Sequence, residues 1–215
     1  MNFLDNIIDP DLLKKASEGL RRYAGISDAG FKKLASFGWY INGDFSLGYT
    51  TALMNKAISE DQKYIDKFFS EYYSNNINEK GKSIALHYEL RSKIISEALI
   101  CHNEEKYNAS TILFLSQADG ICGGLLFRVG KDKAALRAYI SENKGGSFFA
   151  TLMSSIENMT AIDTLYAELN QYDSQLNRHG VMHGWDTEFG TRINSLKAFS
   201  LLSFVADFAS RYKEQ

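Results

Sequence analysis

The chain has 215 residues, of which 45% are hydrophobic and 23% charged, and its formal net charge is −2. This balance is typical of a globular protein with a buried core and excludes wholesale disorder. The near-neutral charge, without a long basic run, also excludes a strong non-specific DNA binder. Any nucleic-acid function must therefore depend on a local site.

The sequence predicts a soluble protein of the cytoplasm. The two cysteines, Cys101 and Cys122, lie in apolar stretches and form no CxxC pair, so we expect small buried side chains in a reducing compartment. Residues 1–10 lack the basic and long apolar regions of a signal peptide. The longest apolar stretches are shorter than the roughly 18 residues that span a bilayer, so we expect no membrane partner.

The first 78 residues are predicted to form a helical extension. The chain has one proline, and its apolar residues recur at spacings of three and four, which indicates an all-α fold. The polar, asparagine-rich stretch 74–81 predicts a link. We therefore place a boundary between an N-terminal helical extension, 1–78, and a helical bundle, 79–215. Within the extension, capping residues and apolar spacing predict helices over 11–23, 28–36, 46–58 and 60–73, with an aromatic turn at 38–44.

Residues from about 80 to the end are predicted to form a bundle of four to five helices. The first long helix has an apolar stripe at Leu86, Leu90, Ile94, Ala98 and Cys101. The second covers 105–127, and the short link 102–104 predicts that the two form an antiparallel hairpin. Further helices are expected over 129–144 and 149–169. The last helix is predicted to begin at the cap Asn194-Ser195.

Residues 171–192 break the helical pattern and concentrate polar groups, including two of the chain's four histidines, His179 and His183. A polar loop positioned by rigid helices commonly carries function. Arg178 carries a permanent cation suited to phosphate, and His183 can act as a general acid or base near neutral pH. Such a pair is sufficient for metal-free RNA cleavage, in which the base takes the 2′-hydroxyl proton and the arginine stabilises the phosphoryl charge.

This segment resembles the motif of the HEPN superfamily (higher eukaryotes and prokaryotes nucleotide-binding). Arg178, the polar His179 and His183 match the pattern Arg-polar-x(3–5)-His, between the third and fourth long helices of the predicted bundle. The resemblance covers roughly residues 80–213. It implies a HEPN-like four- or five-helix bundle, a homodimer whose two motifs share one cleft, and a metal-independent endoribonuclease. Such enzymes act on RNA in toxin–antitoxin or antiviral defence systems, so an antitoxin or regulatory protein is an expected partner, and no cofactor is expected.

Four further residues are candidates near the motif. Asn177, together with His179, is expected to position the substrate. Asp119 lies on or near the apolar stripe of the second long helix, where it either bonds a neighbouring helix or orients Arg178 or His183. Trp185 either stacks on a base or leans on the bundle edge. Arg192 either binds phosphate or pairs with an acid such as Glu188.

Two other interpretations apply to the same residues. His179 and His183 are four residues apart, as two metal ligands on a helix would be, but no nearby cysteine or third histidine completes a set, so we predict no metal site. The alternative function is a non-catalytic helical module that binds a partner protein or a nucleotide. In that case Arg178 and His183 make structural bonds at a dimer seam.

Overall fold

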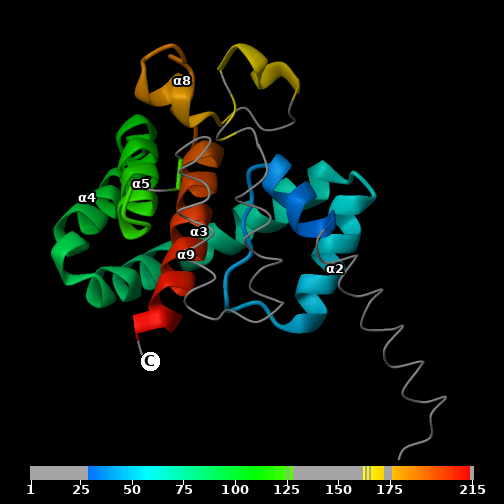
Figure 1. Ribbon diagram of the computed structural model, residues 1–215, viewed down its shortest axis with the longest axis horizontal. Coiled ribbons are helices and arrows are strands. Elements are labelled where there is room, and N and C mark those ends of the chain that lie inside the picture. The colour runs from blue at the N-terminus through cyan, green and yellow to red at the C-terminus, as the bar shows by residue number, and fades with distance from the viewer. Residues whose placement is uncertain are drawn as a thin grey trace, which may run out of the picture.

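Every regular element in the described part of the chain is a helix, which confirms the all-α prediction. The computed structural model in Figure 1 describes residues 29–124, 126–127, 162, 164, 166–171 and 176–213. The helices predicted over 11–23, 129–144 and 149–169 lie wholly or mostly outside these residues. The described elements are a helical stretch at 29–36, α2 (Leu47–Ile58), α3 (Gln62–His87), η1 (Glu89–Arg91), α4 (Ser92–Asn103), α5 (Tyr107–Ile121), η2 (Tyr166–Gln171), α8 (Arg178–Met182) and α9 (Arg192–Lys213).

The helix α9 is the centre of the described structure. It lies between the α4–α5 pair on one side and α2 on the other, and α3 crosses it (Figure 1). Every residue from 194 to 206 is buried, so this helix is enclosed all round instead of presenting one apolar face. Three of its buried polar side chains are bonded to other elements: Ser195 to His102, Lys197 to Asp66, and Ser203 to Asn42.

The polar link predicted at 74–81 is wrong, because these residues lie inside the continuous helix α3. Asp61 caps the start of α3 by accepting the Tyr64 backbone N–H. The stretch remains helical because Tyr73, Ile77, Gly81 and Ile84 share one buried face. A Cβ at Gly81 would lie 2.6 Å from Leu99 Cδ1 of α4, so glycine permits close helix packing. The predicted boundary between 78 and 79 falls within this helix.

The hairpin of α4 and α5 was predicted from its short link, and the two helices do pack side by side. The apolar stripe assigned to the first of them is wrong at its start. Because η1 separates α3 from α4, the predicted stripe does not lie on one helix: Leu86 is 78% exposed, Leu90 is fully exposed and Ile94 is 37% exposed. The second helix ends at Ile121 instead of residue 127, because Gly123 and Gly124 adopt left-handed φ angles of 66° and 76°.

Aromatic packing joins the segment after residue 36 to α3 and α9. The Trp39 indole is fully buried and stacks on Phe69, with ring centroids 5.2 Å apart. Its Nε1–H donates to Asp66 Oδ1 over 2.7 Å. The Tyr40 ring lies 5.9 Å from Phe204 of α9. Residues 31–41 and the bundle helices therefore share one hydrophobic core. In the described part of the chain, no helix has both the length and the apolar character that crossing a membrane requires.

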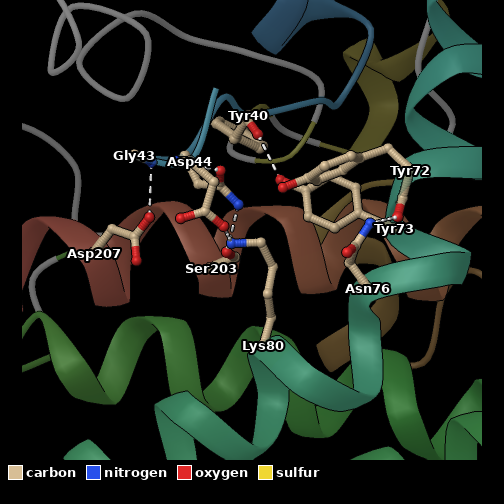
Figure 2. A network of polar contacts seen from close by, with 10 residues as sticks. Tyr40, Gly43, Asp44, Tyr72, Tyr73, Asn76, Lys80, Ser203 and Asp207 are labelled. Atoms are coloured by element: carbon tan, nitrogen blue, oxygen red, sulfur yellow. Dashed lines mark hydrogen bonds and ion pairs between the residues drawn. The ribbon is translucent and has the colours of Figure 1, made fainter. Parts of the chain in front are cut away.

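Figure 2 shows a polar network that fixes the same segment. Lys80 of α3 forms an ion pair with Asp44, and the Gly43 N–H donates to Asp207 Oδ2 of α9 over 2.7 Å. Burial lowers the pKa of Lys80, although the Asp207 carboxylate partly opposes this. The Tyr73 hydroxyl donates to the backbone carbonyl of Tyr40. Because every partner lies on α3, α9 or the 40–44 turn, the network serves to anchor that turn.

Candidate functional site

The helix α8 carries the predicted motif and is held by Asn177 at its start. The Asn177 side chain accepts the Gly180 N–H through Oδ1 at 2.7 Å and donates through Nδ2 to the Thr164 carbonyl at 2.9 Å. The Arg178 backbone N–H donates to the Ile162 carbonyl. Asn177 is 0% exposed. The expectation that Asn177 positions substrate is therefore corrected: its side chain caps α8.

Gly180 allows the segment to fold back on itself. A Cβ at this position would collide with the Tyr166 ring and lie 3.3 Å from Asp186 Cβ. The Gly180 carbonyl also accepts the backbone N–H groups of Trp185 (2.9 Å) and Asp186 (3.1 Å). Residues 177–186 therefore form a compact unit packed against Tyr166.

The outer surface of this unit is a cluster of aromatic and imidazole rings, formed by Tyr166, His179, His183 and Trp185. The His183 ring lies 5.2 Å from the Trp185 indole and stacks nearly parallel to His179 at 6.0 Å. Tyr166 lies 6.2 Å from Trp185. His183 is exposed and Trp185 is 60% exposed. Trp185 therefore presents its ring to solvent beside the candidate base.

Arg178 is held by the face of an aromatic ring. Its guanidinium carbon lies 5.3 Å from the centre of the Phe127 ring, within the range of a cation–π contact. The preceding residue, Leu126, donates its backbone N–H to Asp119 Oδ1 over 3.1 Å. Within the described residues, Asp119 forms no ion pair with Arg178 or His183. Instead, Asp119 fixes the turn whose Phe127 supports Arg178.

The structure brings the rings of His179, His183 and Trp185 together on and just after α8, at one end of the helical assembly (Figure 1). Arg178 begins the same short helix, but its guanidinium contacts Phe127. Arg192 does not join them. Its Nη2 donates to Ser74 Oγ of α3 over 2.9 Å, and the described residues contain no Arg192–Glu188 ion pair.

The helix α9 begins at Arg192, before its predicted cap. Thr191 Oγ1 accepts the Asn194 backbone N–H over 3.2 Å and so caps the first turn.

One histidine of chemical interest was missed from the sequence. His102 is buried, and its Nδ1 lies 2.8 Å from Ser195 Oγ. Burial, and secondly the Arg192 charge, lower the pKa of His102 to about 4. The available signal was its spacing, because His102 follows Ile95, Ala98 and Leu99 on the buried face of α4.

Among the described residues, no three histidine, cysteine, aspartate or glutamate side chains are grouped so that they could hold a metal ion. The chain was also compared with known proteins: no family model matches it, and neither does any curated protein or solved structure.

Proposed function

We propose that this chain is a metal-independent endoribonuclease of the HEPN type and that residues 177–186 carry its active site. The observation that supports this is the position of the exposed His183 imidazole, 5.2 Å from the exposed Trp185 indole and on the same short segment as Arg178. A general base, a stacking surface for a base and a cation for phosphate are the groups that such a reaction uses.

In the proposed reaction, His183 takes the proton from the ribose 2′-hydroxyl. The 2′ oxygen bonds to the adjacent phosphorus, and the bond from phosphorus to the 5′ oxygen of the next nucleotide breaks. The imidazolium returns a proton to that leaving oxygen. The products are a 2′,3′-cyclic phosphate and a 5′-hydroxyl. DNA has no 2′-hydroxyl and is therefore not a substrate.

Arg178 stabilises the negative charge that develops on the phosphoryl oxygens. Its cation is half-buried against Phe127, and within the described residues no carboxylate forms an ion pair with it. A partly desolvated guanidinium interacts with a phosphorane more strongly than one surrounded by water. The Phe127 ring also limits the orientations of the guanidinium, which lowers the entropic cost of binding phosphate.

The proposal extends to the assembly and its setting, which come from the family resemblance. Two chains form a homodimer in which the two α8 segments face one cleft, and the substrate is RNA in the cytoplasm. An antitoxin or another regulatory protein holds the activity in check, as part of a toxin–antitoxin or antiviral defence system.

The test is cleavage of a labelled single-stranded RNA in the presence of EDTA. Wild-type protein should cleave it, and His183→Ala or Arg178→Ala should lower the rate by about 10²-fold or more, while circular dichroism shows an intact fold. His87→Ala is the matched control, because it removes another exposed imidazole, at the end of α3, and should leave the rate unchanged. Folded wild-type protein that neither cleaves nor binds RNA would refute the nuclease and favour the non-catalytic module.

A further inference from the structure

A second polar site lies away from α8, where α3, the α4–α5 link and the start of α9 meet. It is a pocket of about 300 Å³, lined by Ser74, Ile77, His102, Asn103, Glu105, Tyr107 and Arg192. None of these residues belongs to the 177–186 segment. A volume of this size is at the lower end for small-molecule sites and suits a ligand no larger than a sugar phosphate.

Arg192 supplies a cation most of whose donors have no partner among the described residues. Among the described residues, its guanidinium makes one hydrogen bond, from Nη2 to Ser74 Oγ. No described carboxylate lies within ion-pair distance of this guanidinium. A guanidinium has several N–H groups arranged in a fixed fork that matches phosphate. The Ser74 contact orients the group and leaves the remaining donors for a ligand.

His102 supplies a neutral polar group on the pocket wall. Its Nδ1 lies 2.8 Å from Ser195 Oγ, which in turn lies 2.7 Å from Ser110 Oγ, so a buried chain of hydroxyls fixes the ring. The second ring nitrogen has no protein partner among the described residues. It can therefore form a hydrogen bond with a ligand in the pocket.

The ends of the surrounding helices favour an anion. Tyr107 begins α5 without a side-chain cap, and Arg192 begins α9, so the positive ends of two helices meet here. The helix α4 ends nearby, but its terminal carbonyls already accept N–H groups of the link: those of Ile100, Cys101 and His102 accept from Glu104, Lys106 and Glu105. These carbonyl groups at the negative end of α4 are therefore already hydrogen-bonded.

Glu105 determines which anion fits. Glu105 is exposed and lines the pocket. A carboxylate in this position repels a free phosphate ion but accepts hydrogen bonds from hydroxyl groups. A ligand that combines one phosphate with neighbouring hydroxyls satisfies both Arg192 and Glu105. We infer that this pocket binds a small sugar phosphate, with the phosphate on Arg192 and His102 and the sugar hydroxyls on Glu105.

Two kinds of ligand combine a phosphate with neighbouring hydroxyl groups in this way: a free sugar phosphate and the 5′-phosphorylated end of an RNA chain. The probe for the first is ribose 5-phosphate, with ribose and inorganic phosphate as comparisons. The probes for the second are trinucleotide RNAs with a 5′-phosphate or a 5′-hydroxyl. Whichever phosphorylated probe binds more tightly identifies the source. The inference does not depend on the nuclease, because His183→Ala should bind these probes as wild type does.

The experiment is a titration followed by calorimetry and by the histidine NMR signals. We expect saturable binding of ribose 5-phosphate that shifts the His102 resonance and is weakened about tenfold or more in Arg192→Gln, which keeps a donor for Ser74. Glu105→Gln should reduce the ratio of the affinity for ribose 5-phosphate to the affinity for inorganic phosphate. Lys106→Gln is the control, because this neighbouring cation does not line the pocket and should bind as wild type does.

Two results would overturn the inference. One is the absence of saturable binding of ribose 5-phosphate and of 5′-phosphorylated RNA at millimolar concentration. The other is binding that leaves the His102 resonance of the wild-type protein unmoved, which would locate the ligand elsewhere even if Arg192→Gln did not fold.

Discussion

The burial of His102 predicts that the protein loses stability as the pH falls below about 6.5. The pKa of His102 is about 4 in the folded protein, compared with an ordinary value of 6.5. The charged groups that line the same pocket are Arg192 of α9, which lowers the pKa, and Glu105 of the α4–α5 link. Between pH 6.5 and pH 4 the unfolded chain binds a proton that the folded protein does not, so acid favours unfolding.

The size of the effect follows from these two pKa values. One pKa unit corresponds to about 1.36 kcal/mol, so the full difference approaches ~3 kcal/mol, and it is complete only below pH 4. The part lost between pH 7 and pH 5 is about 1–2 kcal/mol, after a reduction for the access of water through the pocket. Other groups titrate in the same range, so the effect must be measured as a difference between variants.

The assay is urea denaturation at pH 7 and pH 5 for the wild type and for His102→Asn. The asparagine keeps a polar group near Ser195 Oγ but cannot take up a proton. The wild type should lose about 1–2 kcal/mol more than the variant between the two pH values. His87→Asn, at an exposed position, should behave as wild type does. Equal losses in wild type and His102→Asn would refute the reasoning that this imidazole is held neutral by burial.

Three further predictions concern packing, capping and thiol reactivity. Gly81→Ala should lower the free energy of unfolding, measured by urea denaturation, by about 1–3 kcal/mol because the new methyl group meets Leu99. Gly48→Ala, in open space on α2, should leave the free energy of unfolding unchanged or raise it by up to about 1 kcal/mol. Destabilisation by both substitutions would contradict this reasoning. Asn177→Ala should cost about 2–3 kcal/mol because it removes a cap and leaves buried groups unpaired, and an unchanged urea midpoint would contradict the assigned bonds. Burial, with a smaller contribution from Asp119, raises the pKa of Cys122 to about 12, so at pH 8 iodoacetamide should alkylate it roughly a hundredfold more slowly than a cysteine peptide, as mass spectrometry can measure.

Local sequence signals predicted the elements whose formation depends on nearby residues. Ser46 caps α2, as expected, and α2 ends at Ile58, as predicted. The short link after α4 produced the expected hairpin with α5. These features depend on capping groups and on loop length, which can be identified without knowing the rest of the fold.

Tertiary packing decided the features that were predicted wrongly. The asparagine-rich stretch 74–81 has weak helix propensity, yet it stays helical because Ile77 and Gly81 pack against other helices. Ser195 and Ser203 of α9 are buried, and each is hydrogen-bonded to a side chain that is distant in the sequence. Leu86 and Leu90 fit the apolar spacing of the predicted helix, but α3 ends between them and both side chains are exposed.

The candidate site was found only in part, for the same reason. The 177–186 segment stood out because it interrupts the helical pattern, and its local sequence places His183 beside Trp185 on the same short segment as Arg178. His102 and Arg192 are far apart in the sequence and line the same pocket only because the fold brings the end of α4 to the start of α9. No local pattern predicts this proximity.

The most direct test of the proposed activity is the chemical structure of the ends it leaves. A DNA oligonucleotide with a single ribonucleotide would be incubated with wild-type protein in EDTA, and the products would be identified by mass spectrometry. The account predicts cleavage immediately 3′ of the ribonucleotide, with a 2′,3′-cyclic phosphate on one fragment and a 5′-hydroxyl on the other. An intact oligonucleotide, or fragments with a 3′-hydroxyl and a 5′-phosphate, would contradict it.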